Sequence, residues 1–375
     1  MLTNYGAMTT EQLTVWSRDF WRETRNQSFL MSFLGDGPTS MIQRVKELRA
    51  GNNGARAVLT LLNNAQGDGI VGDNTLEGNE AELKTSDCVI NLDQWRYAHR
   101  LEGRMADQKS VVGFRANAKD QAAYRAADIV DQLGFLTASG VSYAFNTDGS
   151  ARIGSQLPLL SFAGDVTAPS LNRYVRWDGT AHALAAGNTA VVAAADLPSW
   201  KMLVKLKAYA VNNYVPPNRT DSGVLVWNVF MTPDGIAALK MDTDFLEAWK
   251  LAQQRGDKNP IFEGTKHGGR LGIFIDGLNI LEYRHVYNTR GAVDTAKWGA
   301  GGHIDGQRVL LMGAQALAFA DLDRQTPIWV EKDFDYENSP GISVGRRFGL
   351  KKPTFFNSHT QSIEDHAIVC CDTAI

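Results

Sequence analysis

The sequence predicts a protein of the α+β class. Runs with helical spacing and runs of β-prone residues alternate along the 375 residues. The clearest helical run covers residues 118–136, and two β-prone runs cover residues 57–62 and 88–92. With 44% hydrophobic and 21% charged residues the composition is that of a folded globular chain, so a disordered chain or a coiled-coil rod is disfavoured. A mixed pattern of this kind predicts helices packed on sheets.

The longest predicted helix lies over residues 118–136. Its apolar positions recur at steps of four, four, three, four and three, which places them on one helical face. The other faces carry charged residues, including Asp120, Arg125, Asp128 and Asp131. A helix of about 20 residues is roughly 30 Å long, enough to form the spine of an elongated subunit. The apolar positions are Ala118, Ala122, Ala126, Ile129, Leu133 and Leu136.

Shorter helices are predicted on both sides of this one. Apolar spacing over residues 9–34 predicts an N-terminal helical arm. Ser40 and Gln43 resemble a capping box and Gly51 a C-terminal cap, so residues 40–51 are predicted to be helical. Further helices are expected from Pro198 to the Pro216–Pro217 pair, after Thr232–Pro233, and from Asp244 to Arg255. Strands are expected at 223–230, 271–275, 280–286, 328–334 and 366–371.

The two β-prone runs at 57–62 and 88–92 are joined by about 25 residues, far more than a hairpin loop needs. This connection is rich in glycine and acidic residues, and we expect it to form an arm that reaches away from the body. A calcium site is the alternative interpretation, although the segment lacks the alternating oxygen ligands and closing glutamate of a calcium-binding loop. The candidate residues are Gly67, Asp68, Gly69, Gly72, Asp73, Glu77, Gly78 and Glu80.

Charge and apolar content narrow the class of protein. The 38 basic and 41 acidic residues give a net charge of -3, which disfavours a protein that coats nucleic acid through its phosphates. No apolar stretch approaches the roughly 18 to 20 residues of a transmembrane helix, and the charged N-terminal region does not fit a secretory signal, so a cytosolic protein is expected. Cys88, Cys370 and Cys371 are too few and too badly spaced for a disulfide framework or a metal site.

The common catalytic motifs are missing from the sequence. There is no phosphate-binding loop with a Gly-Lys-Ser/Thr ending, no GxGxxG between a strand and a helix, and no GxSxG elbow. The seven histidines show neither the HExxH pattern nor a paired metal spacing. We therefore expect no catalytic residues, no metal and no cofactor. Extended arms, a long helix and a small net charge instead favour a protein that binds copies of itself.

Several segments, taken in order from about residue 30 to the C-terminus, resemble the major capsid proteins of short-tailed double-stranded DNA bacteriophages. No single segment is specific for these proteins, but the occurrence of all of them in the same order is. The segments are 67–80, 95–99 with Met105, 230–234, 255–262, 310–317, 329–336 and 349–352. Residues 288–303 stand as an insertion relative to this pattern.

The resemblance implies the Hong Kong 97-type capsid fold and a division of the chain. Residues 1–54 would form the N-terminal arm, 55–92 the extended loop, and 93–195 a peripheral domain with the spine helix. Residues 196–325 would form the axial domain, and 326–375 would return to the peripheral domain.

The same resemblance implies the role and the partners. Copies of the chain would build hexamers and pentamers of an icosahedral head that encloses double-stranded DNA without sequence-specific binding. Assembly would take place in the host bacterial cytoplasm, with a scaffolding protein, a portal protein and in some cases a cement or decoration protein as partners, and without a membrane. The alternatives are an encapsulin-like compartment shell, which shares the fold, and a two-domain enzyme without standard motifs.

Overall fold

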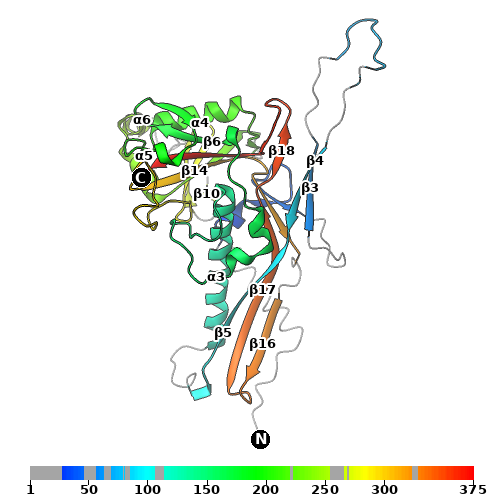
Figure 1. The fold of residues 1–375 in the computed structure, drawn as a ribbon, viewed down its shortest axis with the longest axis vertical. Helices are drawn as coiled ribbons and strands as arrows, with labels where there is room; N and C mark the ends of the chain where they lie inside the picture. Colours follow the sequence, from blue (N-terminus) through cyan, green and yellow to red (C-terminus); the bar gives the residue numbers. More distant parts are fainter. Residues whose placement is uncertain are drawn as a thin grey trace.

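The computed structural model describes residues 28–45, 56–62, 69–78, 80, 85–105, 114–219, 223–253, 266–267, 270–322 and 328–375. These residues form two larger sheets, one long helix and a projecting hairpin (Figure 1). The predicted α+β class is confirmed.

Four α-helices lie in the described part of the chain, and each matches a helix that the sequence predicts. The long helix α3 spans Phe114–Ser139 and so extends beyond the predicted 118–136 at both ends. Helix α4 (Trp200–Asn212) begins after Ser199, whose hydroxyl accepts the Met202 N–H as an N-cap. Helix α5 (Pro233–Met241) has proline at its first turn and Thr232 as its cap, and α6 covers Thr243–Gln253. Single 3₁₀ turns lie at Leu30–Phe33, Leu157–Leu159, Ser161–Asp165, Leu171–Arg173 and Thr189–Val191.

The larger sheet has eight strands and joins segments from three parts of the sequence. Its order is β12-β13-β9-β14-β20-β6-β7, with β8 paired to β9. The fully buried strands β14 and β20, and β9, which is buried except at Leu225, occupy its centre. Leu310 there lies opposite both Phe230 and Cys370. The strands are β6 (Tyr174–Asp178), β7 (Ala183–Ala186), β8 (Asn218–Arg219), β9 (Leu225–Met231), β12 (Ile273–Ile275), β13 (Leu278–Glu282), β14 (Gly306–Met312) and β20 (Ile368–Ala374).

The second sheet has six strands and is elongated. Its order is β1-β2-β15-β17-β16. Strand β15 pairs with residues 348–351 of β17, and β5 pairs with residues 341–348 of the same strand. The 13-residue strand β17 is its longest member, and it pairs with β5, β15 and β16 along its length. The strands are β1 (Leu34–Gly35), β2 (Ile42–Val45), β5 (Asp93–Arg100), β15 (Leu317–Asp321), β16 (Ile328–Phe334) and β17 (Ser339–Lys351).

Three further antiparallel pairs complete the described strands. The hairpin β3 (Arg56–Leu62) and β4 (Thr85–Asn91) matches the two predicted β-prone runs. The other pairs are β10 (Lys266–His267) with β11 (Arg270–Leu271), and β18 (Thr354–Asn357) with β19 (Ser362–Asp365). In Figure 1, β3 and β4 lead towards one end of the molecule, whereas β5, β16 and β17 run beside α3 towards the other end.

Two hydrophobic clusters hold α3 and the two larger sheets together. One joins Leu133 and Phe135 of α3 to Phe230 of β9 and Phe319 of β15. The other fills the space between the eight-stranded sheet and helices α4 to α6, with Trp177 fully buried. The long helix therefore belongs to the core at its C-terminal half and to the elongated sheet at its N-terminal half.

Asp131 of α3 is buried, although the sequence pattern placed it among the charged faces of the helix. Its carboxylate accepts hydrogen bonds from the Ser28 hydroxyl at 2.6 Å and from the Phe29 and Leu30 N–H groups at 3.0 Å, and the Tyr283 hydroxyl also donates to it. Burial raises the pKa of Asp131 despite these donors. This carboxylate fastens the segment that begins at Ser28 to the long helix.

The helix predicted over residues 40–51 is wrong within its described part. Residues Ile42–Val45 form strand β2, which pairs in parallel with β1 and β15. Ile42 and Val45 point to opposite faces of the sheet and are buried in different hydrophobic clusters, whereas their three-residue spacing had suggested one helical face. Tertiary pairing with β15 overrides the local pattern here. Most of the helical arm predicted at 9–34 lies outside the described residues, and its last part forms the 3₁₀ turn at Leu30–Phe33.

Candidate assembly interface

The base of the predicted arm is firmly seated on the body. Strands β3 and β4 pair over seven positions, from Arg56 opposite Asn91 to Leu62 opposite Thr85. Ala57 and Ile90 of this hairpin pack with residues of β2 and β15 in one hydrophobic cluster. The arm therefore leaves the body in a fixed direction.

The buried carboxylate of Asp165 also holds the base of the arm. Asp165 accepts hydrogen bonds from the backbone N–H of Asn91 at 2.8 Å and from its side-chain amide at 3.0 Å. Lys351 of β17 donates to the Val89 carbonyl at 2.6 Å and lies 3.5 Å from the Asp165 carboxylate. Gly349 lies so close to β4 that an added Cβ would stand 2.3 Å from the Asn91 oxygen. Only glycine permits this approach of β17 to the arm.

The tip of the arm carries the candidate residues that the sequence singled out. Gly69, Gly72 and Gly78 adopt positive φ angles of 71°, 70° and 88°, a backbone region that favours glycine. The Gly78 N–H donates to the Glu80 carboxylate at 2.9 Å. Gly67 and Asp68 lie outside the described residues.

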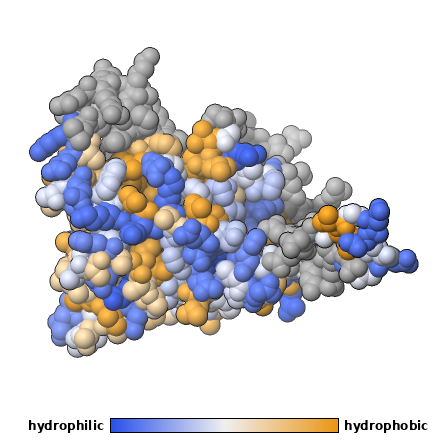
Figure 2. Space-filling view, turned by 90° about the horizontal axis from the view of Figure 1, so that it is seen from above, coloured by the Kyte–Doolittle hydropathy of each residue, from blue (hydrophilic) through white to orange (hydrophobic). Residues whose placement is uncertain are grey.

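The described tip is exposed and chemically mixed. The acidic residues Asp73, Glu77 and Glu80 are exposed. Val71 and Leu76 are 80% and 61% exposed. Figure 2 shows this tip standing clear of the body at the right, with hydrophobic and hydrophilic residues side by side. A surface of this kind is typical of a contact with another molecule.

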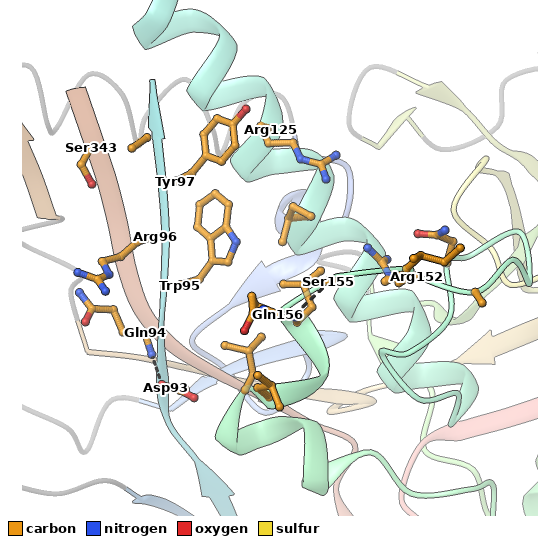
Figure 3. Close-up of a pocket in the computed structure, with 18 residues that line it drawn as sticks. Asp93, Gln94, Trp95, Arg96, Tyr97, Arg125, Arg152, Ser155, Gln156 and Ser343 are labelled. Carbon is orange, nitrogen blue, oxygen red and sulfur yellow. Dashed lines mark hydrogen bonds between the residues drawn. The ribbon is translucent and has the colours of Figure 1, made fainter. Parts of the chain in front are cut away.

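A groove of about 930 Å³ lies between α3 and β5 (Figure 3). Its floor is formed by Trp95 and Tyr97 of β5 and Ile129 of α3, and the segment 151–160 closes one side. Arg125 and Arg152 stand at its edge. Arg125 pairs with Asp128 at 3.1 Å, and Arg152 donates to the Gln132 amide oxygen at 2.6 Å. Burial, together with the charge of Arg125, lowers the pKa of Arg152.

Sequence reasoning missed the strands β5 and β17 that form the elongated sheet. Residues 93–100 alternate between half-buried and exposed positions, and Trp95, Tyr97 and His99 lie on the half-buried side. This period of two was a usable signal in the sequence. Strand β17 carried the same signal at Ile342, Val344, Phe348 and Leu350, interrupted by Arg346 and accompanied by glycines that disfavour a strand.

The metal-ligating side chains of the described residues are dispersed. Within them, no three His, Cys, Asp or Glu side chains come together as a metal site requires. Cys88, Cys370 and Cys371 are buried and unpaired with one another. Burial raises the pKa of all three thiols, that of Cys370 to about 12, so they are poor nucleophiles at neutral pH. In the part of the chain that the structure describes, the helices contain no apolar stretch able to span a bilayer.

A family model and a protein of known role both relate this chain to phage capsid proteins. The family model described as "Phage capsid protein" matches residues 4–375. The major capsid protein of Pseudomonas phage KPP25 is 51% identical over 354 residues, which cover 94% of this chain and 92% of that protein.

Solved capsid structures share the fold at lower sequence identity. The capsid of Ralstonia phage GP4 has a TM-score of 0.74 at 23% identity, covering 93% of this chain and 91% of that chain. The cyanophage Pam1 capsid has a TM-score of 0.67 at 16% identity, covering 100% of this chain and 95% of that chain. These likenesses confirm the predicted capsid fold. Because the family model spans nearly the whole sequence, the chain belongs to the phage capsid protein family.

Proposed function

We propose that this chain is the major capsid protein of a double-stranded DNA bacteriophage and that its copies form the hexamers and pentamers of an icosahedral head. The observation that carries this proposal is the 51% identity to a phage major capsid protein along nearly the whole chain. The geometry supports it, since an arm with a fixed base and an exposed, partly apolar tip is suited to contact a neighbouring copy.

The proposed location is the virion shell, after assembly in the host bacterial cytoplasm. A wall that encloses packed DNA must not bind it tightly, and the net charge of -3 limits the counterion-release attraction that a strongly basic wall would exert. We therefore propose contact with the enclosed DNA that is independent of its sequence. The role is structural, without catalysis and without a cofactor.

We retain the expected division of the chain as part of the proposal. In the N-terminal arm (1–54), residues 28–45 pack into the core of their own subunit, so only the part before Ser28 would contact neighbouring copies, together with the extended loop (55–92). The long helix α3 with the elongated sheet would form the peripheral domain. The axial domain would be built on the eight-stranded sheet, where β6, β7 and β20 add to the strands of residues 196–325.

Assembly of the recombinant full-length chain tests the proposed function. Size-exclusion chromatography and electron microscopy should show rings or closed shells, alone or with a co-expressed scaffolding protein. A 41.2 kDa monomer that never assembles with either would contradict the proposal. Shells that carry a cargo protein by its terminal peptide, and no genome, would instead favour the encapsulin-like alternative.

The partners proposed beyond the chain itself are a scaffolding protein, a portal protein and a cement or decoration protein. Affinity purification of assembling heads from infected cells, followed by mass spectrometry, should recover these proteins in the ratios that an icosahedral head sets. Heads that contain this chain alone would argue against such partners.

The extended loop provides a direct test of the interface. Deletion of residues 66–80 should leave the subunit folded, because the β3–β4 base keeps its seven residue pairs and its hydrophobic cluster. We expect the deletion to abolish stable shells, as seen by electron microscopy, with circular dichroism unchanged. Normal shells from this variant would show that the loop is not an assembly interface.

A further inference from the structure

The turn between β16 and β17 presents an exposed aromatic side chain on an unusual backbone. Asp335, Tyr336 and Glu337, hereafter the hairpin tip, have φ angles of 53°, 49° and 68°. Residues with bulky side chains rarely adopt this left-handed region. The Tyr336 side chain is fully exposed, at 103% relative exposure. Backbone strain of this kind persists only where the surrounding structure enforces it, and it clusters at binding and switch sites.

Hydrogen bonds from Arg104 and Asn338 enforce this backbone. The Arg104 Nε–H donates to the Glu337 carbonyl oxygen at 3.1 Å, and the Arg104 backbone N–H donates to the Asn338 amide oxygen at 3.4 Å. The Asn338 backbone N–H in turn donates to the Asp335 carbonyl oxygen at 3.0 Å. The Arg104 guanidinium also lies 3.8 Å from the Glu337 carboxylate. The backbone that carries Tyr336 is therefore fixed, so less conformational entropy is lost when the tip binds a partner.

Carboxylates flank this tyrosine on both sides. Asp335 and Glu337 are its immediate neighbours in the chain, and both are exposed. Two cations close to the tip are directed elsewhere, because Lys332 and Arg100 lie over the Phe334 ring at 5.1 Å and 4.4 Å from its centroid. The hairpin tip therefore offers one aromatic ring between two acidic groups.

The groove between α3 and β5 has an apolar interior that suits such a ring. Trp95, Tyr97 and Ile129 form its floor, and Figure 3 shows the two aromatic side chains directed into it. Ile153 and Leu159, which also line the groove, are 97% and 75% exposed. Its volume of about 930 Å³ is that of a pocket for a small organic molecule, so it can admit one aromatic side chain.

The charged residues that line the groove are mainly basic. They are Arg96, Arg125 and Arg152, against one acidic residue, Asp93. The Asp93 carboxylate is already engaged, since it accepts hydrogen bonds from the Ser161 N–H at 2.7 Å and from the Ser161 hydroxyl at 3.0 Å. The groove thus has the opposite charge to the two carboxylates of the hairpin tip.

We propose that the hairpin tip of one copy docks in the α3–β5 groove of a second copy. The Tyr336 ring lies on the apolar floor in this arrangement, and the flanking carboxylates face Arg125 and Arg152 at the edge. This inference rests on the proposed function and adds a contact in which the extended loop takes no part.

The geometry of one chain excludes this contact within the same copy. Val344 lies opposite Tyr97 at the groove, and five residues of extended strand, about 16 Å, separate Val344 from Ser339, where β17 begins. Figure 1 shows the β16–β17 hairpin ending at the lower end of the molecule. Because the tip and the groove are different surfaces, each copy binds two others, an arrangement that closes into rings.

A pair of introduced cysteines tests the contact directly. The variant Asp335→Cys with Ile153→Cys places one thiol at the hairpin tip and one at the groove, and it keeps Tyr336. The three native cysteines are buried and should not react. Treatment of assembled particles with a short bismaleimide should give a ladder of linked chains on a denaturing gel. The matched control Asp335→Cys with Leu171→Cys, whose second thiol replaces an 84% exposed side chain outside the groove, should run as single chains.

Removal of the ring tests its part in assembly. Asparagine tolerates a positive φ, so Tyr336→Asn should fold at least as well as the unmodified chain in thermal unfolding. Its yield of shells, measured by electron microscopy and light scattering, should fall by roughly tenfold or more, because an inserted tyrosine carries much of the energy of an interface. The matched control Tyr214→Asn changes another exposed tyrosine with a positive φ of 55°, and it should assemble normally.

Absence of the ladder from normally assembled particles would overturn the inference, and so would normal assembly of Tyr336→Asn. Shells of Tyr336→Asn that form normally but lose an accessory protein would assign the tyrosine to that partner and also overturn it. Failure of the unmodified chain to assemble would count against the proposed function, whereas the crosslink, which can be read on concentrated unassembled protein, would still decide the inference.

Discussion

Buried polar side chains connect distant segments of this fold. Arg173 donates to the carbonyl oxygens of Asp365 at 3.0 Å and Asn213 at 2.8 Å, and it pairs with Glu364 at 3.0 Å. Lys352 pairs with the Asp365 carboxylate at 2.8 Å. The β18–β19 hairpin is thereby attached to residues nearly 200 positions earlier in the chain. Such partners have no local signature, so helical or strand periodicity does not reveal them.

His366 makes this region sensitive to acid. Burial, with the neighbouring Arg173 charge, lowers the pKa of His366 from 6.5 to about 4. The folded protein then binds this proton less readily than the unfolded chain, so the free energy of unfolding should fall as the pH drops from 6.5 towards 4. The variant His366→Gln should flatten this fall in urea unfolding curves, whereas His182→Asn, at an exposed histidine, should leave it intact. An equally steep fall in His366→Gln would refute the assignment.

The elements of this fold differ in how well local patterns predict them. Helices α3, α4 and α5 and the hairpin β3–β4 carry complete local signals, such as one apolar face or a capping residue, and were predicted from them. The strand at Ile42–Val45 was predicted as a helix, because two buried residues three apart suit either structure. Strand β17 was missed because Arg346 breaks its alternation and its glycines at 341, 345 and 349 disfavour a strand locally.

Gly349 shows how one element positions another. The change Gly349→Ala would place a Cβ 2.3 Å from the Asn91 carbonyl oxygen, a backbone atom that cannot rotate aside. Strand β17 or the base of the arm must then shift, and we expect a loss of about 2 kcal/mol in the free energy of unfolding. The control Gly164→Ala meets no atom within 4 Å and should be nearly neutral. Equal stability of both variants in denaturant titrations would show that the close approach does not matter.

At the scale of the whole molecule, the order of several segments along the chain predicted the capsid fold, which no single motif predicted. The acidic loop candidates Asp73, Glu77 and Glu80 were identified from composition and lie at the exposed tip, as expected for a projecting arm. The basic surface that Arg96 and Lys332 share was not predicted, because these residues are 236 positions apart and meet only through the shared strand β17. A surface formed by strand register becomes visible only when the register is known.

A shell held by exposed charges should respond to salt. The Debye length falls from about 10 Å at 0.1 M to about 3 Å at 1 M, so any attraction between the acidic loop tip and basic groups of a neighbouring copy weakens across this range. We expect assembly followed by light scattering to slow as sodium chloride is raised. In the variant Asp73→Asn, Glu77→Gln, Glu80→Gln assembly should be slower at 0.1 M and nearly independent of salt, because the charges that salt screens are gone. Assembly that accelerates with salt in the unmodified protein, or a triple variant that keeps the full salt dependence, would place the driving force in apolar burial elsewhere on the subunit.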